Sequence, residues 1–310
     1  MQSNTTALEA RNWVDETETV ARGVRRRVLE LTLQRNGCYL SQALSSAEIL
    51  ATLYTRILRL GPSLAPPVPP PLAGVPGRGA VAGAGADYNG PRGPGYDRLL
   101  ISPAHYAVAV YATLVETKRM DPTGLDQFNT DGSTVEMIGA EHSPGFELTT
   151  GSFGQALSQA GGIAHARRIR DEAGRVVVFM SDGELEEGQT WEAFQALAFY
   201  RLDNVLVYVD VNGQQVDGRT ADVMNIEPID GRLLGFGASV TRVDGHDVRA
   251  LADAAQDRVM GRPHVVLCDT DSARGVRMLE HRKPRLHYVR FKPDELDAAK
   301  AALSALGAQA

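Results

Sequence analysis

The sequence predicts an α/β fold in which a parallel sheet is flanked by helices. Three runs rich in β-branched residues, at 175–180, 204–210 and 264–269, are almost wholly apolar, which is typical of strands buried on both faces. Segments with helical spacing of apolar residues alternate with these runs. Strands that alternate with helices indicate parallel pairing through right-handed crossovers, with ligands bound beyond the carboxyl ends of the strands.

The other elements are placed by periodicity and by capping residues. Two amphipathic helices are expected first, at 8–35 and 45–59, the second capped by Ser45 or Ser46. The sequence also predicts a short strand at 99–102, helices at 105–119, 155–170, 187–200 and 247–259, and a last helix at 293–306.

One segment departs from this pattern in composition. Pro, Gly and Ala dominate residues 61–95, which include PPVPPP at 66–71 and GRGAVAGAGA at 77–86, and such a segment excludes a regular helix or a central strand. We therefore expect N-terminal helices over 1–60 that pack on the domain, a surface loop, insertion or covering strap over 61–95, and an α/β domain over 96–310, a single domain overall.

Composition excludes several classes of protein. The chain has 310 residues, is 43% hydrophobic and carries a net charge of −6, and no basic run favours nucleic acid. No apolar stretch reaches the roughly 18 to 20 residues needed to span a bilayer, and the first residues do not resemble a signal peptide. Cys38 and Cys268 lie far apart, which favours a reducing compartment. These features predict a cytoplasmic protein without a membrane or nucleic-acid partner.

The most informative stretch is SDGELEEGQTWEAFQALAFYRLDNVLVYVDVNGQQVDG, residues 181–218. Asp182 follows one predicted buried strand and Asn212 the next, so both side chains are expected at the same edge of the sheet. A carboxylate and an amide oxygen that converge there suit Mg²⁺, which takes few protein ligands together with phosphate oxygens and water. Gly183 and Gly213 allow close approach of the backbone to an anion, and the predicted helix near Gly188 points its positive end the same way.

This stretch resembles the thiamine diphosphate motif, a GDG followed after somewhat under thirty residues by Asn, and most closely that of transketolase. The resemblance implies a thiamine-diphosphate-binding fold in which Asp182 and Asn212 are side-chain ligands of Mg²⁺ and the carbonyl of Gln214 is a third. It also implies that Glu184 lies at the cofactor and that Glu187 lies at a subunit interface, in communication between paired sites. Ser181 stands where the family has the first glycine. Taken singly, SDG and VNG are equally typical of a turn and a hairpin; their combination at crossover spacing favours the cofactor.

Two further segments resemble the family. TTGSFGQALSQAGGIA, residues 149–164, matches its glycine-rich loop, which implies that Gly151 and Gly154 turn beside the cofactor and that Phe153 supports its rings. DRLLISPAHYA, residues 97–107, matches the segment that carries an active-site histidine, which implies this role for His105. A glycine-rich loop before an ordinary core helix, or a packed histidine, is the alternative for each segment alone.

The remaining matches are partial. RNGCYLSQALSS, residues 35–46, has Cys38 where the family has a substrate-facing histidine, and we expect Cys38 to be a small buried residue without reactivity. His287 matches a late active-site histidine, and His142 stands near another family histidine in a shorter loop. His246 is expected in a turn that begins a helix. Around His287, the arginines suit a phosphorylated or acidic substrate or form a solvated surface; they are Arg274, Arg277 and Arg282.

The resemblance covers about residues 20–290 without the Pro/Gly segment. It implies transfer of a two-carbon ketol unit from a ketose to an aldehyde, with thiamine diphosphate and Mg²⁺ as cofactors. In the family, later domains bind the pyrimidine ring, so we expect a separate C-terminal subunit to carry them, in an α₂β₂ assembly. Two alternatives stay open: the α subunit of a 2-oxo acid decarboxylase or dehydrogenase, and a non-catalytic regulatory homologue.

Overall fold

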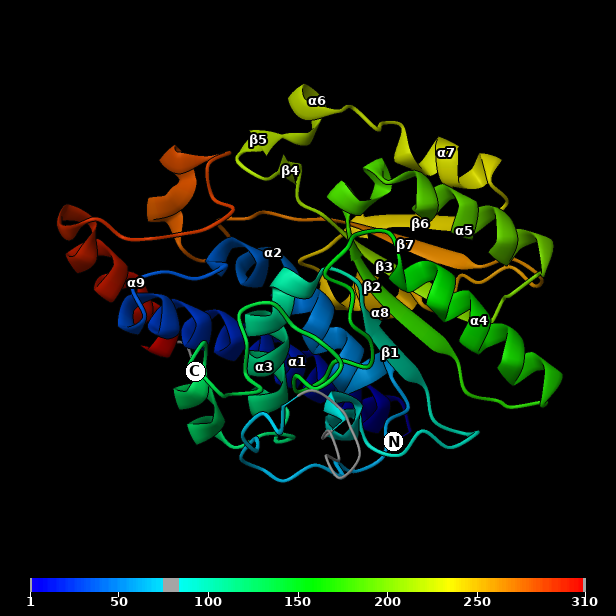
Figure 1. Ribbon diagram of the computed structural model, residues 1–310, viewed down its shortest axis with the longest axis horizontal. Coiled ribbons are helices and arrows are strands. Elements are labelled where there is room, and N and C mark those ends of the chain that lie inside the picture. Colours follow the sequence, from blue (N-terminus) through cyan, green and yellow to red (C-terminus); the bar gives the residue numbers. More distant parts are fainter. Residues whose placement is uncertain (1, 75–83, 309–310) are drawn as a thin grey trace.

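A five-stranded sheet in which all strands run parallel forms the centre of the computed structural model, which describes residues 2–74 and 84–308. The strand order is β1-β2-β3-β7-β6 (Figure 1). The strands are β1 (Arg98–Ile101), β2 (Val176–Ser181), β3 (Val205–Val211), β6 (Ser239–Asp244) and β7 (His264–Asp269). The predicted α/β fold with a parallel sheet is confirmed.

Alternate residues of the central strands build two separate cores. Phe179 and Tyr208 point into one hydrophobic cluster, and their neighbours Val178 and Val207 point into the other. All four side chains are fully buried. The sheet therefore separates two layers of helices, and its strands are apolar on both faces because neither face meets water.

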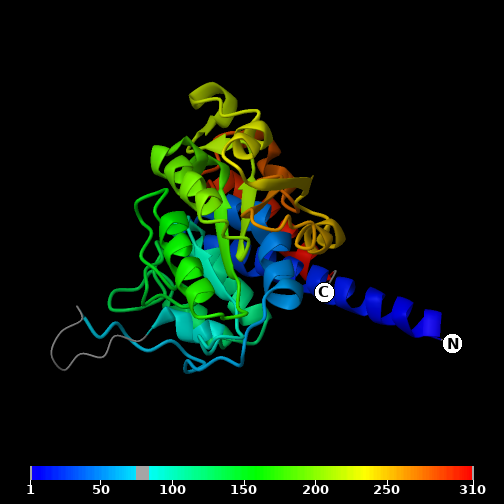
Figure 2. The same cartoon turned by 90° about the vertical axis from the view of Figure 1, so that its right-hand side faces the viewer.

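The two helical layers are unequal. On one face lie α1 (Gln2–Gln34), α2 (Leu40–Thr52), α3 (Ala107–Glu116), α8 (Val248–Ala254) and α9 (Leu296–Ala308). On the other lie α4 (Ala156–Ile169), α5 (Gly188–Phe199) and α7 (Ile229–Gly235) (Figure 1). The first turns of α1 extend away from the body of the protein (Figure 2). No helix within the described residues is both long and apolar enough to cross a membrane.

The described parts of the Pro/Gly-rich segment are tied to the body by backbone carbonyls. Residues 61–74 and 84–95 contain one short 3₁₀-helix, at Gly85–Asn89. The carbonyls of Pro69 and Pro70 accept hydrogen bonds from the side chains of residues 127 and 134 at 3.0 Å each. These contacts tie the described part to the body of the protein, and its role as a loop, insertion or covering strap stays a prediction. Residues 75–83, which include most of the run at 77–86, lie outside the described residues.

Two of the predicted helices have different ends in the structure. The second helix begins at Leu40 and gives way to a π-turn at Leu53–Ile57, so the prediction that Ser45 or Ser46 caps it is wrong. Both serines lie inside the helix, where the Ser46 hydroxyl donates to the carbonyl of Gln42. The helix expected at 247–259 ends at Ala254.

Several short elements have a polar composition and are therefore not predicted from the sequence. Strand β6, at the edge of the sheet, has the sequence SVTRVD, with two valines among four polar residues, which is a weaker signal than an apolar run. A two-stranded hairpin, β4 (Gln214–Gln215) with β5 (Gly218–Arg219), and the short α6 (Thr220–Val223) follow β3. This hairpin stands directly beside the end of β3 that carries Asn212.

Helix α5 offers a matched test of the packing. We expect Phe194→Ala to lower the free energy of unfolding by about 3 to 5 kcal/mol, because Phe194 is fully buried between α5 and the sheet. Phe199→Ala in the same helix should change it by about 0.5 kcal/mol or less, because Phe199 is 77% exposed. Urea unfolding of the isolated chain measures both values; equal losses would contradict this placement of α5.

Candidate functional site

Two polar turns meet where β2 and β3 end. Asp182 begins a 3₁₀-turn directly after β2, and Asn212 follows β3, which pairs with β2 in parallel register. The Oδ2 atom of Asp182 accepts a hydrogen bond from the backbone N–H of Gly213 at 2.9 Å and one from the Thr220 hydroxyl at 3.3 Å. The backbone N–H of Gly183 donates to Oδ1 at 3.0 Å. The two segments thus lie at the same sheet edge, as the sequence predicts.

A second carboxylate, that of Asp210, lies beneath this edge and is fully buried. Its Oδ2 accepts from the Ser45 hydroxyl at 2.6 Å, from the Tyr106 hydroxyl at 2.8 Å and from the Asn212 amide at 3.3 Å. Its Oδ1 accepts from the hydroxyl of Thr270. The carboxylate therefore joins α2, the turn before α3, β3 and the loop after β7.

The electrostatics of this edge fit a cation. Burial raises the pKa of Asp182 to about 7, and the charge of Asp210 adds to the rise; burial also raises the pKa of Asp210. Within residues 2–74 and 84–308, neither carboxylate has a Lys or Arg ion-pair partner. Two buried acids without a cationic partner suit a divalent ion, which would hold them ionised. Within the same residues, no group of three or more His, Cys, Asp or Glu is placed to hold a metal ion.

The turn after β3 has the shape that an anion needs. Gly213 has φ +69°, and a Cβ there would meet open space, so the backbone is accessible from that side. The backbone N–H of Gln214 donates to the Asn212 amide oxygen at 2.9 Å, and the side-chain Oε1 of Gln214 is buried without a hydrogen-bond partner. A Cβ at Gly183 would lie 2.2 Å from Oε1 of Gln215, so a larger residue there would displace the end of that side chain.

Glu184 ties three loops together from a fully buried position. Its Oε1 accepts from the Ser102 hydroxyl at 2.5 Å and from the Gly154 N–H at 3.4 Å, and its Oε2 accepts from the Ser181 N–H at 3.4 Å. Burial raises its pKa to about 7. Its oxygens position the glycine-rich loop against β2; its contact with a cofactor stays a prediction.

The glycine-rich loop lies where the resemblance placed it, at the same edge. Gly154 has φ +77° and packs against Glu187, whose Cβ would be 3.0 Å from an added methyl group. Gly151 faces open space. Glu187 is exposed at the start of α5. Exposure is compatible with the predicted place of Glu187 at a subunit interface.

Two predicted active-site histidines meet in an aromatic cluster. The rings of His105 and His287 lie 5.3 Å apart, and Tyr39 contacts both at 5.4 and 5.3 Å. Phe153 lies 5.6 Å from His105. Burial, with the nearby His287, lowers the pKa of His105 to about 3, and burial lowers that of His287. His105 is therefore a neutral imidazole at physiological pH, able to donate or accept one hydrogen bond at each nitrogen.

Cys38 lies next to this cluster but turned into the core. The residue is fully buried. Its backbone N–H donates to the carbonyl of Val289 at 3.1 Å, and its carbonyl accepts from the N–H of Val289 at 2.9 Å. Burial raises the pKa of the thiol to about 12. The expected burial of Cys38 is confirmed, its low reactivity stays a prediction, and Tyr39, the next residue, is the one that contacts the histidines.

A buried charge network holds the loop after β7 in place. Arg25 pairs with Glu48, and Nδ1 of His246 lies 2.9 Å from the same carboxylate. The backbone N–H of Asp271 donates to the other ring nitrogen of His246 at 2.8 Å. Although burial alone would raise it, the charge of Arg25 and the hydrogen bond from His246 lower the pKa of Glu48 to about 2. His246 thus has a structural role, beyond the turn expected for it.

The other candidate residues are more peripheral. His142 lies 2.8 Å from Glu136, away from the ends of β2 and β3. Arg282 pairs with Glu295 and donates to a backbone carbonyl, whereas Arg274 and Arg277 are exposed. A cavity of about 380 Å³ opens beside Asn212, and Arg219 and Lys283 line it.

Sequence reasoning missed Tyr39, Tyr106, Asp210 and Thr220. Asp210 carried a signal, because a charge inside an otherwise apolar strand two residues before Asn212 must find partners. Tyr106 stood next to His105, and only the 3₁₀-turn at Ala104–Tyr106 decides that it points inward. The other two carry no local signal.

Comparison with known proteins agrees with this geometry. The sequence model of the transketolase thiamine diphosphate binding domain matches residues 86–308. The chain belongs to the transketolase family. Its described site, at the carboxyl ends of β2 and β3, lies inside the matched region.

Several transketolase relatives are of similar length. A transketolase family protein of Sinorhizobium fredii, itself uncharacterized, is 36% identical over 279 residues, which cover 89% of this chain and 90% of the relative. An apulose-4-phosphate transketolase subunit of Actinobacillus succinogenes is 30% identical over 288 residues, covering 92% and 95%. A 6-deoxy-6-sulfo-D-fructose transketolase subunit of a Clostridium species is 28% identical over 288 residues, covering 91% and 95%.

Solved transketolases share the fold. That of Campylobacter jejuni superimposes with a TM-score of 0.71 at 20% identity, over 94% of this chain and 43% of the other. A Pichia stipitis transketolase variant gives 0.71 at 21% identity, over 93% and 40%. The chain thus spans less than half the length of these solved proteins.

The buried Glu184 predicts an unusual pH dependence. Its pKa is about 7 in the folded chain against 4.5 ordinarily, so between these values the native state binds the extra proton and stability falls as pH rises. We expect Glu184→Gln to remove up to about 3 kcal/mol of this fall between pH 4.5 and 7. Urea unfolding across this pH range measures it, with Glu141→Gln at an exposed position as baseline. Parallel curves for wild type and Glu184→Gln would contradict the role of Glu184.

Proposed function

We propose that this chain binds thiamine diphosphate through Mg²⁺ and, with a second subunit, transfers a two-carbon ketol unit from a ketose to an aldehyde. One observation carries the proposal: the buried Asp182 and the Asn212–Gln214 turn meet at the end of two parallel strands without a cationic partner among the described residues. Membership of the transketolase family gives this cation site its chemistry.

Each residue of the site has a distinct role in the proposal. Asp182, the amide oxygen of Asn212 and the carbonyl of Gln214 would hold Mg²⁺. Room for the diphosphate would be left by four glycines, Gly151, Gly154, Gly183 and Gly213. Phe153 would support the rings of the cofactor, and Glu184 would hold the loops in position. When bound, thiamine diphosphate supplies the electron sink for cleaving and forming the carbon–carbon bond.

The aromatic cluster is the substrate end of the site. His105, His287 and Tyr39 contact one another in a triangle, and as neutral imidazoles the two histidines can each hold or pass a proton at a ring nitrogen. Tyr39 occupies the space beside the position where the family has a histidine and this chain has Cys38. We propose that these side chains position the hydroxyl groups of the sugar, and that Arg274 and Arg277 favour a phosphorylated or acidic donor.

The second subunit is part of the proposal. Two relatives of matching length are named as transketolase subunits, and solved transketolases have more than twice this length. A partner subunit with the pyrimidine-binding and C-terminal domains would complete the site, with Glu187 at the interface, in an α₂β₂ complex that is inactive when divided. A cytoplasmic location stays a prediction from the sequence.

The first experiment is capture of the tagged chain from its native cells, with mass spectrometry of what co-purifies. We expect near-stoichiometric recovery of a second chain, and turnover of a ketose donor with an aldehyde acceptor by the complex. Turnover of a 2-oxo acid instead would favour the decarboxylase alternative. Recovery of the chain alone, or a complex that binds no Mg-thiamine diphosphate, would favour a non-catalytic homologue and contradict the proposal.

Asp182 provides the sharpest test of the cofactor site. We expect Asp182→Ala to weaken Mg²⁺-dependent binding of thiamine diphosphate to the purified complex by about a hundredfold or more. Mutation of residues that only hydrogen-bond to metal ligands already lowers metal affinity by about 10- to 100-fold, and loss of a ligand should cost more. Asp222→Ala, a surface aspartate paired with Arg219, is the matched control and should leave binding unchanged. Isothermal titration calorimetry measures both; unchanged affinity in Asp182→Ala with intact folding would contradict the assignment.

A further inference from the structure

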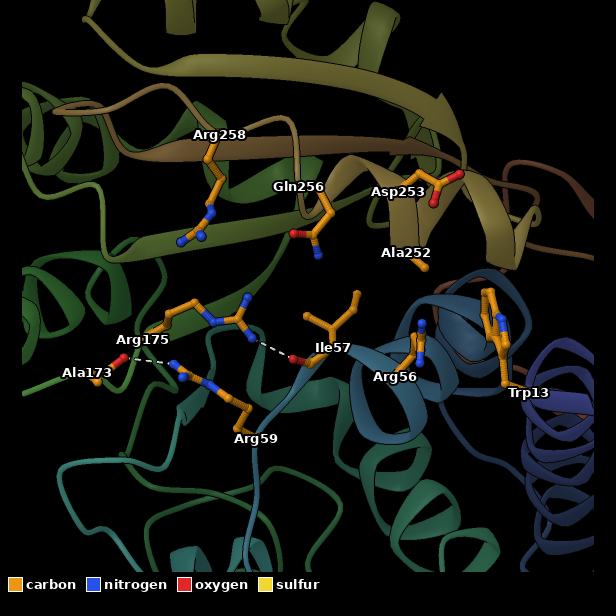
Figure 3. A pocket seen from close by; sticks show the side chains of 10 residues that line it. All are labelled: Trp13, Arg56, Ile57, Arg59, Ala173, Arg175, Ala252, Asp253, Gln256 and Arg258. Atoms are coloured by element: carbon orange, nitrogen blue, oxygen red, sulfur yellow. Dashed lines mark hydrogen bonds between the residues drawn. The ribbon is translucent and has the colours of Figure 1, made fainter. Parts of the chain in front are cut away.

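Four arginines gather around one cavity at the edge of the sheet opposite the cofactor site. Arg56, Arg59, Arg175 and Arg258 line a hollow of about 650 Å³ together with Trp13 (Figure 3). We call these five residues the arginine groove. Such clustering is unexpected in a chain with a net charge of −6, and one further charged residue, Asp253, lines the hollow beside Ala252.

Two of the arginines are fixed in position. The buried Asp97 lies between them: Arg59 donates to its Oδ1 at 3.0 Å and Arg175 to its Oδ2 at 2.7 Å. Each guanidinium also donates to a backbone carbonyl, Arg59 to that of Ala173 at 2.8 Å and Arg175 to that of Ile57 at 2.5 Å (Figure 3). One carboxylate thus serves two guanidinium groups, which leaves an excess positive charge that is already ordered.

The other two arginines have no acidic partner. Within residues 2–74 and 84–308, neither Arg56 nor Arg258 forms an ion pair with a carboxylate. Arg56 lies over the ring of Trp13, 5.1 Å from its centroid. Arg258 extends from the loop after α8 toward Arg175 (Figure 3). Both are exposed, so a ligand reaches them without a change in the fold.

The arginine groove is separate from the cofactor site. Arg175 directly precedes β2, whereas Asp182 directly follows it. Six residues of strand place the two ends about 20 Å apart. A ligand in the arginine groove therefore does not touch the reacting groups.

We propose that the arginine groove binds a small molecule that carries two or more phosphate groups, as an effector site distinct from the catalytic edge. Guanidinium groups pair with phosphate oxygens through two parallel N–H donors, which makes arginine the favoured phosphate ligand. Arg59 and Arg175, which are already ordered, bind one phosphate group. Arg56 and Arg258 bind the second. The volume is within the range of small-molecule sites.

Trp13 allows the test to report the position of the ligand. The chain has two tryptophans, so Trp191→Phe leaves Trp13 as the one emitter. Inorganic pyrophosphate is titrated into this full-length variant in EDTA, because the diphosphate site needs a divalent cation. We expect a saturable change in Trp13 emission. No change in EDTA would overturn the proposal. In a separate titration without EDTA, a change that prior saturation with Mg-thiamine diphosphate abolishes would overturn it as well.

Charge-reversal variants separate a specific site from general attraction. We expect the double variant Arg56→Glu with Arg258→Glu to weaken pyrophosphate binding in calorimetry about tenfold or more, since both lose phosphate contacts. The matched control, Arg232→Glu with Lys300→Glu, reverses the same number of exposed charges on α7 and α9 and should change affinity less than about twofold. Equal weakening in both double variants would overturn the proposal.

Three further ligands decide the chemical class. Inorganic orthophosphate should bind about tenfold or more weakly than pyrophosphate, because it engages one pair of arginines; equal affinity would contradict the two-phosphate assignment.

Adenosine triphosphate and fructose 1,6-bisphosphate then compare a nucleotide with a sugar bisphosphate. Tighter binding of either one than of pyrophosphate supports the site and assigns its source, and failure of both to displace pyrophosphate would overturn an organic ligand. None of these outcomes depends on transketolase activity.

Discussion

The buried carboxylate of Asp210 is the constraint on which the rest of the site depends. It lies one residue before the end of β3, and its oxygens accept hydrogen bonds from α2, the turn before α3, the Asn212 amide and the loop after β7. A buried acid with four donors is satisfied only when these segments are all in place. The network therefore fixes the end of β3, and through it the turn that faces Asp182.

The parallel sheet brings these acids together at a cost. Asp182 and Asp210 follow or end neighbouring strands, so register alone places them at one edge. Burial makes their charged forms unfavourable, and the pKa of each rises. Natural proteins retain such uncompensated polar groups chiefly at functional sites, where a ligand completes the charge balance. The electrostatic cost at this edge is thus itself an argument for a cation site.

Sequence predicted the fold and the core of the site because both depend on local pattern. The apolar runs of β2, β3 and β7 and the spacing of Asp182 and Asn212 specify strands and a shared edge. Strand β6 was missed because an edge strand needs no apolar run, and Ser45 was misread as a cap because its hydroxyl serves Asp210, 165 residues away in the chain. Contacts of that kind, like the edge-on contacts of Tyr39 with two histidines, arise only when distant segments meet.

The cations beside the proposed site are already paired with carboxylates, which weakens their attraction for an anionic sugar. Of the two cations that line the cavity beside Asn212, Arg219 pairs with Asp222, and Lys283 pairs with Asp271 and Glu280. The two histidines of the aromatic cluster have lowered pKa values and add no positive charge at neutral pH. An acidic group on the donor must therefore compete with these carboxylates, or meet cations from outside this cavity. In the proposed complex, a partner subunit that supplies such cations would also influence the choice of sugar.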